Sequence, residues 1–504
     1  MNKHKISLRQ IVIFFIQFIL FIGFLAGVVI LFLNVNKAYA YLALVLLYVL
    51  NVIFVFIIYA QNREQEAKLS WIYLVMLIPI IGHAIFIGYG LIFRNNFELE
   101  INNDSKYQLL TYKNEILGNN KLKPYNDLKQ IQNINQNILL PANFDFFAEG
   151  YRFYDDLFAS LKKAQKTIYI VTYIIKKSEI TTEFLDTLEQ KANNGVKIKW
   201  LVDDFGAMLS QKKQLRRLDK HPNIEIKLIG KIYYPFINAA SFSRNHEKFI
   251  IIDNKVVFSG GNNISDEYSS MSKKYGHWID LNYRITGPYI NSYIIHFIKY
   301  WKFIAKKDID VHSSLFIDND LTKYHNQALL VTDSPSYTYS ESELFFLKMI
   351  PNAKKSIKIA TPYFSVSRAL KKQLILALKS GVEVTIFFPG LPDKKLVYKI
   401  GLYQLSKLQQ HGLKILIYED HFLHTKAGLI DDKYGWVGTN NWDSRSMYSQ
   451  YETMDIFEGK SIAKLNEIFS DYEQKCQNVE NFPQFEKKPT VIEKFLYDIS
   501  KPLI

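Results

Sequence analysis

Two stretches of the chain repeat one set of reactive residue types at one spacing. They read HEKFIIIDNKVVFSGGNN, residues 246–263, and HTKAGLIDDKYGWVGTNN, residues 424–441. Each follows the pattern H-x-K-x4-D, six residues then separate the Asp from a Gly, and an Asn comes three positions later. One such match is weak, because a short pattern arises by chance, but two copies with the same Gly and Asn indicate a duplicated site. The candidate site residues are His246, Lys248, Asp253, Asn263, His424, Lys426, Asp431 and Asn441.

The spacing predicts how these side chains are positioned. Residues two apart on a strand point to one face, so each His lies beside its Lys. We expect a buried strand over 249–252 and over 427–430, ended by the Asp. A second strand over 256–259 and over 434–437 then ends in a Gly turn that presents the Asn beside the His.

This set of groups suits phosphoryl transfer. An imidazole can attack phosphorus while an ammonium group and an amide hold the oxygens as charge develops. Two copies supply two histidines, so one can be the nucleophile. The other can protonate the leaving alkoxide and later deprotonate the incoming alcohol.

The flanking sequences carry a family resemblance. Residues 244–268, RNHEKFIIIDNKVVFSGGNNISDEY, and 422–452, FLHTKAGLIDDKYGWVGTNNWDSRSMYSQYE, resemble the bacterial cardiolipin synthases of the phospholipase D superfamily. The resemblance implies transfer of a phosphatidyl group from one phosphatidylglycerol to another through a phosphohistidine, giving cardiolipin and glycerol. Two positions depart from the family pattern: Glu247 replaces a basic residue, and the second turn has Thr439 where Ser is usual.

The resemblance also assigns supporting roles. Acids at the offsets of Asp280 and Glu452 accept a hydrogen bond from a catalytic His and fix its tautomer, although the sequence leaves open which acid serves which His. Asp253 and Asp431 are expected to anchor the turns rather than to touch phosphate. Two roles remain open for Arg244 and Arg445. They could bind a second anionic headgroup or form ordinary salt bridges.

The rest of the chain repeats as well, which predicts the fold. LKKAQKTIYIVTYI, residues 161–174, matches IPNAKKSIKIATPYF, residues 350–364, and each is followed by an amphipathic helix, a Gly-Val pair and another strand. Strand–helix–strand alternation predicts an α/β fold with a largely parallel sheet. We therefore expect two duplicated phospholipase D-like α/β sandwich lobes whose histidines meet at a pseudo-two-fold axis.

The N-terminal region is apolar enough to enter a membrane. Residues 11–33, 38–60 and 69–93 form long apolar runs, and about 20 residues suffice to span the hydrocarbon core as a helix. Pro79 and several glycines interrupt the third run, so it crosses as a kinked helix or enters as a re-entrant segment, of which we favour the crossing. His83 lies inside it and is expected to be a packed, neutral histidine.

The sequence leaves open on which side of the membrane the catalytic part lies. Lys3, Lys5 and Arg9 favour a cytoplasmic N-terminus, and three crossings would then place the catalytic part outside. The family resemblance instead implies a catalytic part that faces the cytoplasm. The expected organisation is a multi-pass cell-membrane protein with transmembrane segments in 1–93, a linker over 94–140, a first lobe over 141–305, an inter-lobe linker over 306–325 and a second lobe over 326–504.

Composition agrees with such an enzyme but does not choose its substrate. The chain has 504 residues, 48% of them hydrophobic, and a formal charge of +14, which fits anionic lipid headgroups and would equally fit nucleic acid. The sequence contains no CxxC or HExxH pattern, so it gives no reason to expect a metal or another cofactor. The expected partners are phosphatidylglycerol and cardiolipin, with no nucleic acid, and the oligomeric state is not determined. Three alternatives remain: a phospholipase D or other phosphatidyltransferase, a membrane-tethered nuclease, and a non-catalytic lipid-binding protein.

Overall fold

The chain forms two compact units. The computed structural model describes residues 22–23, 26–27, 29–30, 33, 37–61, 63, 65–91, 94–118, 126–135, 137–207, 209–232, 239–271, 276–482 and 489–501. One unit comprises Met1–Ile92 and Ile232–Ala240, and the other comprises Phe93–Lys231 and Ser241–Ile504. The larger unit contains both copies of the His-Lys-Asp pattern.

The strands of the larger unit repeat in two halves. The first half has the order β1-β9-β7-β6-β2-β3-β4, and the second half repeats it as β10-β19-β17-β16-β11-β13-β14. The strands of the first half are β1 (Leu140–Phe147), β2 (Thr167–Thr172), β3 (Lys197–Asp203), β4 (Ile224–Ile229), β6 (Phe249–Ile252), β7 (Val256–Gly260) and β9 (Asn282–Thr286). Those of the second half are β10 (Asn326–Asp333), β11 (Ser356–Ala360), β13 (Glu383–Pro389), β14 (Lys414–Tyr418), β16 (Ala427–Ile430), β17 (Tyr434–Gly438) and β19 (Gln450–Gly459).

The two halves form one continuous sheet. Strand β1 pairs antiparallel with β10, with Leu140 opposite Ala328. The duplicated α/β lobes are therefore confirmed, whereas the expectation of a largely parallel sheet is wrong. Along the main path of described strands, β2-β3-β4 and β11-β13-β14 run parallel and the other neighbours are antiparallel. The short connection from β6 to β7 makes a hairpin, whereas a parallel pair needs a long crossover.

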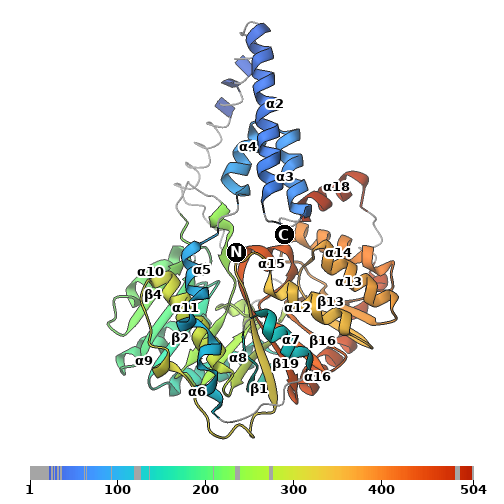
Figure 1. Ribbon diagram of the computed structural model, residues 1–504. Coiled ribbons are helices and arrows are strands. Elements are labelled where there is room, and N and C mark those ends of the chain that lie inside the picture. The colour runs from blue at the N-terminus through green and yellow to red at the C-terminus, as the bar shows by residue number, and fades with distance from the viewer. Residues whose placement is uncertain are drawn as a thin grey trace. The chain divides into compact units, whose positions relative to one another are not determined.

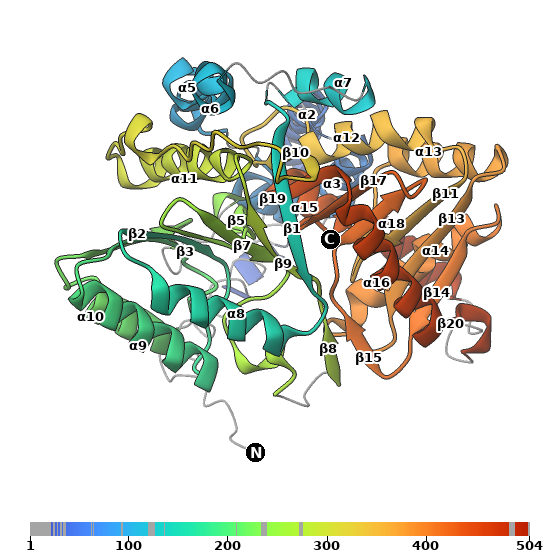
Figure 2. The ribbon, with the colours of Figure 1, turned by 90° about the horizontal axis from the view of Figure 1, so that it is seen from below.

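Helices cover both faces of this sheet (Figure 2). In the first lobe, Ile168 and Ile170 of β2 face α8, α9 and α10, while Tyr169 and Val171 face α11. This alternation follows from the two-residue period of a strand. The second lobe repeats the arrangement with α12, α13 and α14 on one face and α16 on the other. The helices are α8 (Gly150–Lys163), α9 (Glu179–Asn193), α10 (Leu209–Leu218), α11 (Ile290–Ala305), α12 (Glu341–Met349), α13 (Arg368–Lys379), α14 (Lys395–Gln409) and α16 (Ser461–Lys475).

A buried carboxylate ties the two lobes together. Asp455 on β19 accepts hydrogen bonds from the hydroxyls of Tyr283, Tyr289 and Tyr293, at 2.5, 2.6 and 2.7 Å. The three hydrogen bonds lower the pKa of Asp455, but burial outweighs them and raises this pKa to about 6. The three tyrosines belong to the first lobe and β19 to the second, so this cluster fixes the strand that also carries Glu452.

The segment 94–140, expected to be a linker or loose helices, forms short helices that pack on the lobes. It forms α5 (Asn96–Asn103), α6 (Lys113–Leu117) and α7 (Asn126–Asn135) before β1 begins. Leu128 and Ile131 enter the core of the second lobe, and the Glu98 carboxylate accepts from the hydroxyls of Ser334 and Ser336, both at 2.6 Å. A few apolar residues at helical spacing suffice for this packing.

The smaller unit contains one helix long and apolar enough to cross a membrane among the described residues, α2 (Lys37–Ala60). Figure 1 shows α2 beside α3 (Gln65–Leu77) and α4 (Ile81–Ile85), and Phe54 and Ile58 of α2 pack with Val75 and Phe86. The predicted span over 11–33 lies mostly outside the described residues.

The third apolar run folds back on itself. Helix α3 ends before Pro79, and α4 and a π-helical turn over Phe86–Gly90 return toward the start of α3. Arg63, which precedes α3, donates a hydrogen bond to the carbonyl of Gly90. A continuous helix would separate these two residues by about 40 Å, so the described part of this run forms a helical hairpin. The crossing and the re-entrant alternative both stay predictions.

Two residues of the third run fix this reversal. A Cβ on Gly82 would lie 2.4 Å from the carbonyl oxygen of Leu74, so only glycine allows the close return of the chain. Nδ1 of His83 accepts from the N–H of Ile80 at 2.9 Å, and its ring packs against Phe54. This agrees with the expectation of a packed histidine at a helix break.

Candidate active site

Two short ladders between the lobes bring the residues of both His-Lys-Asp copies together. Strand β5 (Arg244–Asn245) pairs parallel with Gln450–Tyr451 at the start of β19, and β8 (His277–Ile279) pairs parallel with β15 (His421–Leu423). The next residues in the two registers are His246 opposite Glu452 and Asp280 opposite His424. The backbone pairing therefore places each histidine against an acid of the other lobe.

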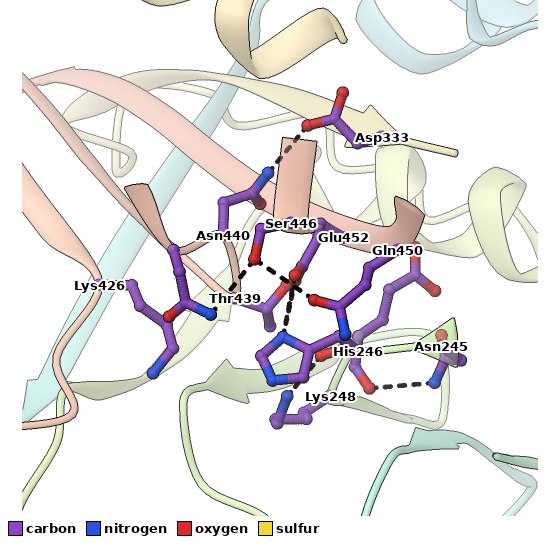
Figure 3. A network of polar contacts seen from close by, with 12 residues as sticks. Asn245, His246, Lys248, Asp333, Lys426, Thr439, Asn440, Ser446, Gln450 and Glu452 are labelled. Carbon is purple, nitrogen blue, oxygen red and sulfur yellow. Dashed lines mark hydrogen bonds and ion pairs between the residues drawn. The ribbon is translucent and has the colours of Figure 1, made fainter. Parts of the chain in front are cut away.

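The side chains complete these pairings. Nδ1 of His246 lies 2.9 Å from Oε1 of Glu452, and Nδ1 of His424 lies 2.6 Å from Oδ2 of Asp280. Figure 3 shows the first pair with Lys248 and Lys426 close by. A carboxylate that accepts from Nδ1–H leaves the lone pair on Nε2, which is the tautomer that a nucleophile or general base requires.

The two pairs differ in their electrostatics. Burial raises the pKa of Glu452 well above its usual range, and burial with the nearby Lys248 lowers the pKa of His246 well below its usual value. Burial also opposes ionisation of Asp280, but Lys426 and His424 outweigh it, so the pKa of Asp280 falls. Asp280 raises the pKa of His424, but burial outweighs this effect and lowers that pKa to about 4, so both imidazoles are neutral near pH 7 before a substrate binds.

The two lysines are the cations of the site. Lys248 and Lys426 are buried, and each Nζ donates to the carbonyl of the histidine two residues before it. Burial lowers the pKa of Lys248 to about 7 and that of Lys426 to about 8. Before an anionic substrate binds, both charges are therefore lost in the mildly alkaline range.

We expect kcat/KM for an anionic substrate to fall as pH rises above about 7 to 8, because deprotonated lysines no longer hold phosphate. Lys248→Arg should shift this alkaline limb upward, since a guanidinium stays charged. The measurement is kcat/KM from pH 5 to 10 in detergent micelles, with the exposed Lys197→Arg as the control. A wild-type profile that stays flat to pH 10 would contradict the assignment of the lysines.

Asp253 and Asp431 lie at the opposite ends of their strands from the histidines. Asp431 accepts from the backbone N–H groups of Lys354, Lys355 and Ser356 at 2.7, 2.7 and 3.0 Å. Asp253 does the same for residues 165–167 at the start of β2. Each carboxylate thus joins the motif strand to the neighbouring strand of the sheet, which is a structural task.

Asp431→Ala should lower the free energy of unfolding by about 1–3 kcal/mol, because it removes the acceptor of three N–H groups. Asp432→Ala is the matched control: the two residues have φ of 55° and 51°, so the backbone penalty is shared, and Asp432 is exposed. Thermal unfolding in detergent measures the difference, with turnover per folded molecule changed less than about tenfold. Loss of turnover without loss of stability would mean that Asp431 acts in the chemistry.

The two predicted amide donors are engaged with their own loops. Nδ2 of Asn263 donates to the Tyr268 hydroxyl at 2.8 Å, and its Oδ1 accepts from the N–H of Ile174. Nδ2 of Asn441 donates to Oγ of Ser446 at 3.2 Å. Each NH2 group has a second hydrogen, so these bonds orient the amides without using all of their donors.

The sequence did not identify several groups that lie against the histidines or their acids. The ring of Trp278 lies 4.8 Å from that of His424, and the ring of Tyr173 lies 5.2 Å from that of His246. A Cβ on Gly261 would lie 2.2 Å from the Asp280 carboxylate. The two ring contacts join segments far apart in the chain. The position of Trp278 two residues before Asp280 was the one local indication.

The two basic residues with open interpretations differ in their surroundings. Arg244 is buried, with Nη1 3.3 Å from Oδ1 of Asp203 and Nη2 2.7 Å from the carbonyl oxygen of Gly230. Arg244 therefore forms an internal salt bridge with Asp203 and does not form a headgroup site. Arg445 is half-buried on α15 (Ser444–Ser449) and lies within electrostatic reach of Tyr173.

The two departures from the family pattern also have structural explanations. Oε1 of Glu247 lies 2.8 Å from Nε2 of His296 on α11, which is not one of the two candidate catalytic histidines. The Thr439 hydroxyl accepts from the N–H of Thr453 at 3.0 Å, next to Glu452. Within the described part of the chain, no group of three or more His, Cys, Asp and Glu side chains is placed to hold a metal ion.

Comparisons with known proteins agree with this geometry. Residues 157–288 and 346–474 match the family described as "Cardiolipin synthase, PLD-like domain". A cardiolipin synthase of Clostridium perfringens is 32% identical over 86% of this chain and 92% of its own length, and one of Staphylococcus aureus is 30% identical over 84% and 88%. The crystal structure of phosphatidylserine synthase from Haemophilus influenzae superposes with a TM-score of 0.59 at 17% identity, covering 75% of this chain and 100% of that one, which shows the shared fold.

Proposed function

Because the chain belongs to the cardiolipin synthase family with a PLD-like domain, we propose that it transfers a phosphatidyl group from one phosphatidylglycerol to another, giving cardiolipin and glycerol. It is thus a phosphatidyltransferase that acts on membrane phospholipids. The observation that carries the proposal is the pair of buried histidines, each hydrogen-bonded through Nδ1 to an acid of the other lobe.

In the first half-reaction, Nε2 of His246 attacks the phosphorus of one phosphatidylglycerol. The P–N bond forms as the bond from phosphorus to the glycerol headgroup oxygen breaks, and His424 gives that oxygen its proton. Lys248 and Lys426 stabilise the charge on the phosphate oxygens, with Asn263 and Asn441 as amide donors. The products are a phosphatidyl-histidine and free glycerol.

The second half-reaction reverses the proton transfer. His424, now neutral, removes the proton from a headgroup hydroxyl of a second phosphatidylglycerol, and this oxygen attacks the phosphatidyl-histidine. The P–N bond breaks and cardiolipin leaves. His424 is chosen as the proton carrier because the ionised Asp280 behind it favours its protonated form, whereas burial raises the pKa of Glu452 behind His246. Arg445 is the cation that we assign to the phosphate of the acceptor lipid.

The test is incubation of purified, detergent-solubilised protein with labelled phosphatidylglycerol, without added metal. Cardiolipin and glycerol should appear in equal amounts. Phosphatidic acid in place of cardiolipin would show that water is the acceptor and would overturn the synthase assignment in favour of a phospholipase. Cleavage of DNA with unchanged lipid would favour a nuclease.

For the membrane topology we propose two crossings, over 11–33 and by α2, followed by a re-entrant hairpin. The hydrogen bond between Arg63 and Gly90 supports the hairpin, because it joins the residue before α3 to the end of the third apolar run. Lys3, Lys5 and Arg9 favour a cytoplasmic N-terminus, and in this topology the N-terminus and the catalytic lobes share one side.

Cysteine labelling tests this topology. In a background with Cys476→Ala, the Ser105→Cys variant should resist a membrane-impermeant maleimide in intact cells, and the Asn36→Cys variant should react. Reaction of the Ser105→Cys variant in intact cells would mean that the catalytic lobes lie outside and that the hairpin crosses.

A further inference from the structure

The two copies of the site differ in charge at one matching position. Four positions after the Asn of each copy, the first copy has Glu267 and the second has Arg445. The Glu267 carboxylate is neutralised, because its Oε2 lies 2.5 Å from Nζ of Lys176. The duplicated fold therefore places a cation in the second lobe where the first lobe has a paired anion.

A second cation, Lys394, ends the loop that follows β13. At the start of this loop, the N–H groups of Gly390 and Leu391 donate to the carbonyl of His421 at 3.1 and 3.0 Å. His421 begins β15, and this strand ends directly before His424. The loop that carries Lys394 is therefore attached to the strand that positions a catalytic histidine.

Tyr363 fixes the far end of the same loop. Its hydroxyl donates to Oδ2 of Asp393 at 2.5 Å, and Nζ of Lys394 lies 4.9 Å from the centre of its ring. The ring is buried in the apolar cluster that also contains Trp278, which contacts His424. The Asp393 carboxylate is thus held by Tyr363, while the Lys394 side chain is exposed.

The charges of Lys394 and Arg445 meet on one side of the site. Burial is the main cause of the low pKa of His246, and the charge of Lys394 lowers this pKa further. Both cations also act on Asp443, whose carboxylate accepts from the N–H of Ser446 at 2.7 Å. Among the residues that the structure describes, no carboxylate forms an ion pair with Lys394 or Arg445.

The first lobe does not repeat this arrangement. Its corresponding loop, which follows β3, begins with Asp204, and Oδ1 of this residue lies 2.7 Å from Nζ of Lys212 on α10. Cations and anions therefore cancel on the side of the first lobe, whereas two cations remain available on the side of the second lobe.

We infer that Lys394, together with Arg445, binds the phosphate of the acceptor lipid and so selects an anionic lipid alcohol over neutral alcohols and water. The inference rests on the proposed function, in which His424 deprotonates the acceptor hydroxyl. The glycerol headgroup separates that hydroxyl from the acceptor phosphate, so this phosphate lies beyond the catalytic pair and needs cations of its own. A guanidinium can bind phosphate in a bidentate manner, and an ammonium adds a point charge.

The selection has a chemical consequence. The phosphatidyl-histidine can be attacked by a second phosphatidylglycerol, by the glycerol just released, or by water. Only the first of these carries a phosphate, so the two cations favour the forward reaction to cardiolipin over return to phosphatidylglycerol.

The experiment compares two acceptors for the same phosphatidyl-enzyme. Purified full-length protein in detergent micelles receives phosphatidylglycerol and isotope-labelled glycerol. Cardiolipin measures transfer to the lipid, and label in phosphatidylglycerol measures transfer to glycerol. Lys394→Gln and Arg445→Gln should each lower the ratio of cardiolipin to labelled phosphatidylglycerol at least about fivefold, because a charge-assisted contact with the acceptor is lost. Lys394→Arg should keep the ratio within about twofold of the wild type.

The ratio separates acceptor binding from general damage. Both products come from one intermediate, so a loss of folded protein lowers both equally. Lys395→Gln is the matched control, since it removes the neighbouring exposed lysine and the same net charge, and it should leave the ratio within about twofold. An unchanged ratio in Lys394→Gln would overturn the inference. An equal fall in Lys395→Gln would overturn it as well, by showing an effect of net charge at the micelle surface. A wild-type protein that makes no cardiolipin would refute the proposed function itself.

Discussion

His246→Asn is expected to lower turnover of phosphatidylglycerol by at least about 10⁴-fold, and His424→Asn to do the same. Either change removes a nitrogen that must attack phosphorus or carry a proton, and each histidine is bonded to its own acid, so neither can take over the task of the other. Thermal unfolding in detergent should show that both variants fold. His221→Asn, a surface histidine bonded to Asn193, should keep turnover within about twofold.

A substrate with an activated leaving group separates the two roles. A phosphatidyl ester of p-nitrophenol needs no general acid, because its leaving group is stable as an anion. His424→Asn should therefore still release one p-nitrophenol per enzyme in a burst and accumulate the phosphatidyl-enzyme, whereas His246→Asn should release none. The reverse result would exchange the roles of the histidines, and full activity of either variant would end the two-histidine mechanism.

Exchanging the acid behind each histidine should have the next largest effect. Glu452→Gln and Asp280→Asn are each expected to lower turnover by about 10²- to 10⁴-fold, as for the acid of a serine-protease triad. An amide can donate to Nδ1 and so favour the tautomer that places the proton on Nε2. The loss should appear in kcat, since neither acid contacts the phosphate in our mechanism.

A double-mutant cycle tests the pairing between the lobes. Glu452→Gln should add little to the loss caused by His246→Asn, because the acid acts through that histidine. Glu458→Gln, an exchange of the same kind on the same strand, controls for general damage to β19. If the effects of Glu452→Gln and His246→Asn multiplied in full, Glu452 would have a separate role.

Much of the site could be predicted from the sequence because its parts are local. The strands expected over 249–252 and 427–430 coincide with β6 and β16, since an apolar run of four ended by Asp leaves little choice. The following hairpins and the duplication of the lobes are fixed by the same short-range pattern. The resemblance to the cardiolipin synthases supplied the chemistry.

The tertiary structure decided what depends on distant partners. The carboxylates of Asp280 and Glu452 meet their histidines 144 and 206 residues away through the β8–β15 and β5–β19 ladders, and no local pattern contains those registers. Likewise, composition could not tell that Arg244 is paired with Asp203, or that Lys394 lies over the ring of Tyr363. A sequence specifies strand, turn and residue type through neighbours along the chain, whereas pairing, burial and pKa arise only when segments far apart are brought into contact.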